Sequence, residues 1–409
     1  MKMTVGDSIT ASHPFRNPLF LRVWAGTAIS LLGDQFYLVA LPWVILKTTG
    51  SVLTMSTVLL VSAVPRAGLM LIGGVASDRY PSRKILLGTA LMRGAVVALV
   101  GILIWLQLLL KPELYVLGFV FGVADAFALP AMQTYLTCLV SHDRLIEANS
   151  IIQTTTQLII MIGPATAALI TNKLGPTSGF LLDAFSFLVL ASLLWVLPDR
   201  QIVDSQFRST VWTSILEGIQ YVRRDSPLLM LIMLILVVNV CLTGPIVVGL
   251  PYLASVIFGM PAAYGYLLSA WAVGGVLGKL ISPYFKLRFS APLIFGVSVF
   301  MGTCLILIGM LSRLWFIGVV LLLMGVVSGL VTLQILSWCQ LRTAESIRGR
   351  VTSVFMWAGG VATPLSVALA GGMIRWNVKL TFVLAGVFMF SASVVIAMWR
   401  ATYSNEEAI

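Results

Sequence analysis

The stretch Gly73–Lys84, GGVASDRYPSRK, decides how the rest of the chain is organised. A long apolar run ends here in an acid–base pair, Asp78 and Arg79. Pro81 then prevents the helix from continuing, and two further cations stand directly before the next apolar run. The pattern predicts a very tight, strongly basic turn between two membrane helices.

The composition places both flanking runs in a membrane. The chain has 409 residues, of which 59% are hydrophobic and only 10% are charged, whereas a soluble domain carries about 25% charged residues. Apolar windows longer than about 18 residues, each able to span a bilayer, recur along the whole chain. Spanning segments must satisfy their backbone internally, so we predict an all-α polytopic membrane protein.

The apolar runs predict twelve spans and one long polar break. We place the spans at residues 19–46, 51–76, 84–110, 113–139, 146–172, 176–197, 227–250, 263–285, 290–312, 314–338, 350–374 and 379–400. The break carries an amphipathic piece, Val211–Arg224, which we expect along the membrane surface. We therefore predict a six-helix bundle over 1–197, a cytoplasmic linker with an amphipathic helix over 198–226, and a second six-helix bundle over 227–409.

The charged loop residues set orientation. The net charge of +11 would suggest nucleic acid in a soluble protein, but these cations collect in the loops on one side of the predicted spans. We expect both termini and the linker in the cytoplasm, and no nucleic-acid partner. The four cysteines lie in or at the ends of apolar runs without a CxxC pair, so neither a metal nor a disulfide framework is indicated.

Ionisable residues inside the predicted spans are the most informative feature after the turn. Each costs several kcal/mol at bilayer depth and calls for a reason. Five lie well inside, all in the first six spans: Asp34, Arg66, Arg93, Asp125 and Asp183. The last six spans offer Lys279, near enough to an end to snorkel. In these last six spans, we expect an apolar substrate wall that also carries neutral polar groups. The candidate residues are Asn239, Gln334, Trp338 and Trp357.

Each buried charge has two interpretations. Asp34 is either a carboxylate that takes up and releases a proton or a static partner of Arg66 or Arg93. The same choice applies to Asp125. We expect the two arginines to be charge partners of the acids rather than substrate ligands. We place Asp183 nearer the outer surface, with a role in helix packing or gating.

The turn resembles the signature loop of the major facilitator superfamily, G-x-x-x-D-R-x-G-R-[RK]. The matching residues are Gly74, Asp78, Arg79, Arg83 and Lys84, while Pro81 and Ser82 depart from the pattern. The resemblance implies two pseudo-symmetric six-helix repeats. It also implies a gate in which Asp78 accepts hydrogen bonds at the start of span eleven, beside Arg350, while the other cations fix topology. The alternative is a plain positive-inside loop.

Several stretches are similar to a bacterial drug-efflux branch that includes macrolide and enterobactin-type exporters. They include Phe15–Asp34, Ala128–Leu136 and the DAFSF sequence at Asp183. This similarity implies a multi-pass protein of the bacterial inner membrane that exports lipophilic or amphipathic compounds by alternating access. Protons would drive export, with Asp34 and Asp125 as the proton-coupled acids. We expect a monomer in contact with membrane lipid.

Other functions remain open at this point. Within transport they are a dedicated siderophore exporter, a lipid flippase and facilitated uptake. A membrane enzyme would need a catalytic set, but the sequence has no HExxH or GxSxG motif, and His13 and His142 lie in predicted cytoplasmic segments. A receptor or scaffold would need a larger soluble domain. No G-x-x-x-x-G-K-[ST] loop is present, so we expect a proton gradient rather than ATP, and no cofactor.

Overall fold

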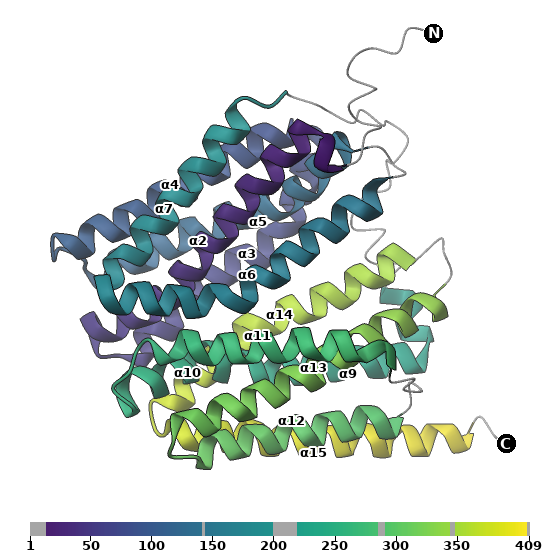
Figure 1. The fold of residues 1–409 in the computed structure, drawn as a ribbon. Helices are drawn as coiled ribbons and strands as arrows, with labels where there is room; N and C mark the ends of the chain where they lie inside the picture. The colour runs from purple at the N-terminus through teal and green to yellow at the C-terminus, as the bar shows by residue number, and fades with distance from the viewer. Residues whose placement is uncertain (1–13, 141–143, 199–218, 285–290, 344–347, 407–409) are drawn as a thin grey trace, which may run out of the picture. The chain divides into compact units, whose positions relative to one another are not determined.

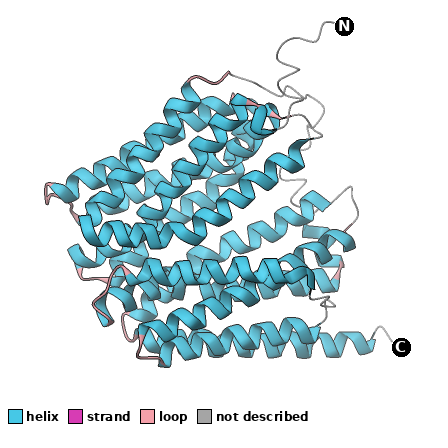
Figure 2. Cartoon of the chain, in the orientation of Figure 1, coloured by secondary structure: helices cyan, strands magenta, loops and turns pink. Residues whose placement is uncertain are grey.

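The computed structural model describes residues 14–140, 144–198, 219–284, 291–343 and 348–406. Every regular element within these ranges is helical, as Figure 2 shows. Nine of the described helices are long and apolar enough to cross a membrane, and three shorter apolar helices accompany them. The described helices fall on all twelve predicted spans, and the prediction of an all-α polytopic protein is confirmed.

The turn at Gly73–Lys84 is as tight as its sequence indicates. Helix α3 (Val52–Arg79) ends at Arg79 and α4 (Ser82–Trp105) begins at Ser82, so Tyr80 and Pro81 alone separate them. The Tyr80 amide donates to the Ala76 carbonyl at 2.8 Å, which closes the last turn of α3. Pro81 has φ −55° and ψ 113° at the N-cap of α4. Its ring suits the start of a helix and stops the preceding one.

Contacts between helices divide the chain into two compact units. Unit 1 comprises Met1–Thr49 and Val58–Arg208, and unit 2 comprises Gly50–Thr57 and Ser209–Ile409. The predicted domain boundaries at 197/198 and 226/227 stay a prediction, because most of the linker lies outside the described residues. Of the amphipathic piece, residues 219–224 are described and are helical.

Unit 1 contains the first six long helices, except for the first residues of α3, which belong to unit 2. After α2 (Pro18–Thr49), α3 and α4 come α5 (Lys111–Leu139), α6 (Leu145–Leu174) and α7 (Pro176–Trp195), labelled in Figure 1. Gly175 joins α6 to α7 with φ 83° and ψ 162°, a conformation open almost only to glycine. Pro176 then begins α7 with a ring already suited to the first helical position.

Unit 2 continues with α9 (Ser226–Gly244), α11 (Ala263–Ile281), α12 (Ala291–Met310), α13 (Leu314–Arg342), α14 (Arg348–Ile374) and α15 (Val378–Glu406). Asp225 caps α9 by accepting a hydrogen bond from the Leu228 amide at 3.1 Å. The seventh span does not end near residue 250, as the sequence predicts, but continues in wider π-helical turns, Pro245–Gly249 and Leu253–Ile257. Prolines 245 and 251 lack an amide donor, and the wider turns carry the helix past them.

The two units repeat the same helix pairings. In unit 1, α7 packs on α2 and α4, α6 on α2, and α5 on α4. The corresponding long helices of unit 2 pair in the same way: α15 packs on α9 and α12, α14 on α9, and α13 on α12. This repetition of helix pairings is what two parallel repeats of one bundle require.

Glycines 274 and 278 of α11 lie so close to the α13 backbone that any β-carbon would collide with it.

Candidate functional site

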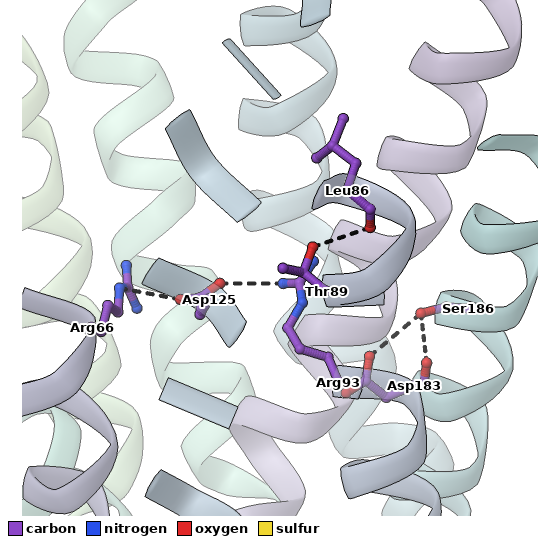
Figure 3. Close-up of polar contacts among 7 residues, drawn as sticks. All are labelled: Arg66, Leu86, Thr89, Arg93, Asp125, Asp183 and Ser186. Carbon is purple, nitrogen blue, oxygen red and sulfur yellow. Dashed lines mark hydrogen bonds and ion pairs between the residues drawn. The ribbon is translucent and has the colours of Figure 1, made fainter. Parts of the chain in front are cut away.

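The polar residues of unit 1 are centred on the Asp125 carboxylate of α5. Arg66 of α3 approaches it with Nε at 3.2 Å from Oδ2, and Arg93 of α4 with Nη1 at 3.2 Å from Oδ1 (Figure 3). Each guanidinium therefore takes one carboxylate oxygen. The sequence predicted these three residues as acid and charge partners, and the structure brings them together. Asp125 is the acid that both arginines contact.

The two arginines differ in their surroundings. The Arg93 side chain is 10% exposed, and its guanidinium carbon lies 4.5 Å from the centre of the Phe187 ring of α7. That geometry is a cation–π contact. The Arg66 side chain is 61% exposed. Arg66 is therefore the exposed partner of Asp125, and Arg93 is the buried one.

Asp34 of α2 is the acid without an ion pair. It is half-buried, and among the described residues no arginine or lysine nitrogen lies within ion-pair distance of its carboxylate. Its charge nevertheless interacts with Arg93, Asp125 and Arg66. Asp34 therefore differs from Asp125, whose carboxylate contacts both arginines. An ion pair between Asp34 and either arginine, which the alternative interpretation requires, is not present among the described residues.

Asp183 of α7 also joins the cluster, which sequence reasoning did not expect. The residue is completely buried, and its charge interacts with Asp34 and Arg93. A β-carbon at Gly33 would collide with the Ser186 hydroxyl and lie 2.6 Å from Asp183 Oδ1. Gly33 therefore permits the close approach of α2 to α7 that places the Asp183 carboxyl against the α2 backbone.

Tyr37 is a further member of the cluster that the sequence analysis missed. It stacks on Phe121 of α5 with ring centres 4.8 Å apart and meets Phe180 edge-on at 5.8 Å. The available signal was its position one helical turn after Asp34, which puts both side chains on one face of α2.

The signature-loop residues have separate roles in the described part of the chain. Arg83 donates from Nε to the Leu194 carbonyl at 2.8 Å and from Nη2 to the Trp195 carbonyl. It therefore caps the C-terminus of α7, where unpaired carbonyls favour a cation. Gly74 has open space around its α-carbon, whereas its neighbour Gly73 lies against the Ala126 carbonyl of α5. The side chain of Lys84 is exposed. The side chains of Asp78, Arg79 and Arg350 lie outside the described part.

The substrate candidates of unit 2 are only partly described. Asn239 donates to the Ile235 carbonyl of its own helix at 2.8 Å. Gln334 donates to the carbonyl and hydroxyl of Ser282, both at 3.1 Å, and so ties α13 to the end of α11. Trp338 packs against a buried cluster made of Val222 and of residues from α9 and α14. The side chain of Trp357 lies outside the described part.

Unit 2 contains a cavity that the sequence did not indicate. It has a volume of about 680 Å³ and lies between α9, α14 and α15. Its lining is almost entirely apolar, with Ser366, Thr381 and Ser391 among the polar exceptions. Ser366 accepts a hydrogen bond from the Gly244 amide at 2.6 Å and donates to the Val240 carbonyl. Its hydroxyl therefore joins α14 to α9.

Comparisons with known proteins identify the family of this chain. A family model described as Major Facilitator Superfamily matches residues 23–366. The multidrug efflux pump Tap of Mycolicibacterium fortuitum is 27% identical over 380 residues, covering 87% of this chain and 89% of that protein. The enterobactin exporter EntS of Shigella flexneri is 28% identical over 380 residues, covering 90% and 86%. Macrolide efflux protein A of Streptococcus pyogenes is 24% identical over 395 residues, covering 93% and 95%.

Solved structures show the same fold. The nucleoside transporter NupG superposes with a TM-score of 0.71 at 13% identity, covering 93% of this chain and 98% of that one. A bacterial homologue of the iron transporter ferroportin in an inward-facing state gives a TM-score of 0.69 at 16% identity, covering 92% and 98%. The chain is a multi-pass protein of the bacterial inner membrane and a transporter rather than an enzyme. It belongs to the major facilitator superfamily.

Proposed function

We propose that this transporter exports lipophilic or amphipathic compounds in exchange for protons, by alternating access. The relatives named as a multidrug efflux pump and a macrolide efflux protein support export of such compounds. One observation carries the proton coupling: the charge cluster of unit 1 contains an acid, Asp34, that is half-buried and without an ion-pair partner among the described residues. A buried titratable group of this kind in a membrane helix is a candidate for a proton pathway.

The cluster couples protonation to side-chain rearrangement. In this proposal, Asp125 alone binds both arginines when Asp34 is neutral, a pairing supported by the two ion pairs of Asp125. When Asp34 loses its proton, its carboxylate competes for the same cations. Arg66 is the more exposed of the two and can leave Asp125 at the smaller desolvation cost. Proton entry from outside and release inside would therefore switch the cluster between two pairings.

We assign the substrate-binding wall to the second half of the chain and the cytoplasmic gate to the end of α3 and the start of α14. The first half handles charge, and the second half offers a mainly apolar wall to the compound, as suits a broad binder. Asp78, at the end of α3, would hold the cytoplasmic side closed through hydrogen bonds at the start of α14, with Arg350 adding charge. Both termini face the cytoplasm in this proposal. Transporters of this superfamily generally need no cofactor, and the proton gradient supplies the energy.

A dedicated siderophore exporter is the second candidate. The observation in its favour is the 28% identity to the enterobactin exporter EntS over 90% of this chain. The two candidates share the proton mechanism and differ in the compound that stimulates it.

Proton flux in liposomes tests both candidates. Purified protein is supplied with lipophilic cations, macrolides or siderophores, and substrate-dependent proton movement is recorded for wild type and Asp34→Asn. Glu113→Gln removes a carboxylate that lies outside the cluster and caps α5, so it serves as the control. We expect Asp34→Asn to bind substrate but to lose coupled flux, and the control to retain it. Equal coupled flux in wild type and Asp34→Asn would refute the proton site.

A further inference from the structure

The cavity of unit 2 is a groove with a buried floor and an exposed rim. On the floor, Cys241 of α9 is 3% exposed and Ala370 of α14 is 2% exposed. On the rim, Leu365 of α14 is 54% exposed and Phe388 of α15 is 58% exposed. Because the exposed rim comes from α14 and α15, the groove opens sideways between these two membrane helices.

The lining suits an occupant without polar groups along its length. Three hydroxyl groups lie in the lining, and each already donates to a backbone carbonyl: those of Ser366, Thr381 and Ser391. An apolar cavity whose hydroxyls are satisfied offers ordered water too few partners and stays dry. Its volume of about 680 Å³ is nevertheless that of a small-molecule pocket. Hydrocarbon is therefore the chemistry that the groove accepts.

The groove is about as long as one leaflet of a bilayer is thick. Its lining runs from Thr381 to Ser391 along α15 and from Leu365 to Met373 along α14. At 1.5 Å per residue these stretches measure about 15 Å and about 12 Å. The hydrocarbon core of a bilayer is about 30 Å thick, so one leaflet accounts for about 15 Å. An acyl chain of a membrane lipid therefore matches the groove in length.

One end of the groove carries the residues of a membrane–water interface. Met373 and Thr381 line this end, and the short connection from α14 to α15 lies between them in the sequence. Arg375 in that connection is exposed, and Trp376 beside it is 85% exposed. Among the described residues, no carboxylate lies within ion-pair distance of Arg375. Tryptophan and arginine at the end of a span are typical of the level of the lipid headgroups.

We infer that this groove binds one membrane phospholipid, with an acyl chain between α14 and α15 and the phosphate at Arg375. Arginine suits the contact, because its guanidinium donates two parallel hydrogen bonds to phosphate oxygens. A lipophilic transport substrate would fit the apolar groove as well, but Arg375 and Trp376 at its end favour an amphiphile with an anionic head. The site lies wholly within unit 2 and uses no residue of the charge cluster, so it is independent of the proposed proton coupling.

Native mass spectrometry tests the groove. Purified protein in detergent is titrated with phosphatidylglycerol, and the dissociation constant of the first bound lipid is compared among variants. Ala385→Phe places a ring in the groove, because Ala385 belongs to its lining. Ala392→Phe is the control, since Ala392 is also half-buried on α15 but lies outside the lining. We expect binding of the first lipid to be lost in Ala385→Phe and retained in the control, and equal affinity of the two variants would overturn the inference.

Arg375→Gln tests the phosphate contact without disturbing packed side chains, so it stays informative if Ala385→Phe does not fold. Lys173→Gln removes the same charge from the last turn of α6, the counterpart of α14 in unit 1. We expect phosphatidylglycerol to bind about fivefold more weakly to Arg375→Gln, which corresponds to about 1 kcal/mol for one cation at a membrane surface. Lys173→Gln is expected to bind like wild type, and equal effects of the two substitutions would overturn the inference.

A neutral lipid separates the phosphate from the acyl chains. Wild type is titrated with a diacylglycerol that has the same chains as the phosphatidylglycerol but no phosphate. We expect this neutral lipid to bind more weakly than phosphatidylglycerol, and to bind equally to wild type and Arg375→Gln. Equal affinity of wild type for both lipids would overturn the inference, because the groove would then accept apolar molecules without regard to the head group.

Discussion

Replacing Gly33 by alanine tests the close approach of α2 to α7 that places the Asp183 carboxyl against the α2 backbone. A β-carbon at this position would lie 2.6 Å from Asp183 Oδ1 and 2.7 Å from Ser186 Cβ, besides meeting the Ser186 hydroxyl. The Cβ atom of Ser186 is fixed by the α7 backbone, so α2 and α7 must separate. Overpacking of this kind costs about 1 to 3 kcal/mol. Alanine regains up to about 1 kcal/mol of helix propensity over glycine.

Gly88→Ala isolates the packing cost. Gly88 lies within α4 and has no neighbouring atom within 4 Å of an added β-carbon, so its substitution carries only the propensity gain. We expect Gly33→Ala to be less stable than Gly88→Ala by about 1 to 3 kcal/mol, measured by reversible denaturation in detergent micelles. Coupled proton flux is expected to fall in Gly33→Ala alone. If both variants gained stability equally, the close approach of α2 to α7 at Asp183 would be refuted.

Three further predictions concern the ion pairs and the loop. Asp125→Asn leaves Arg93 buried without its carboxylate and is expected to lower the free energy of unfolding by about 3 kcal/mol. Arg66→Gln removes an exposed partner and is expected to lower it by less than about 1 kcal/mol. Denaturation curves of both variants check this order, and equal losses of stability would contradict it. Arg83→Gln removes the cation at the C-terminus of α7 and is expected to cost about 1 kcal/mol, seen as a lower melting temperature; an unchanged melting temperature would rule out the cap. Asp78→Asn is expected to weaken the outward-open state and transport without preventing membrane insertion, which transport assays at equal expression measure, and normal transport would remove the gate assignment.

The architecture was largely predictable because each span is a continuous apolar run. The turn after α3 was equally clear, since an Asp-Arg pair and Pro81 interrupt two such runs. The end of the seventh span was predicted too early, near residue 250, whereas the helical segment continues to Ile257. Proline in a soluble helix is a reliable stop, but a membrane helix must keep its backbone bonded and widens its turns instead.

The charged residues of the site were predictable, but their pairing was not. Depth along a helix can be counted from its end, which identified Asp34, Arg66, Arg93 and Asp125 as buried charges. Rotation about the helix axis and the contact between α2 and α7 decide which groups meet, and both depend on packing. Asp183 was therefore assigned to helix packing or gating, although its carboxyl lies in the charge cluster.

The hydrogen bond from Arg83 to the Leu194 carbonyl joins the basic turn between α3 and α4 to the C-terminal end of α7. Asp183 lies twelve residues before Trp195, which corresponds to about 18 Å along the axis. The basic turn between α3 and α4 and the buried Asp183 carboxyl are therefore connected through one continuous helix. An antibody fragment bound to this turn would therefore contact the loop that Arg83 joins to α7, about 18 Å along that helix from the Asp183 carboxyl.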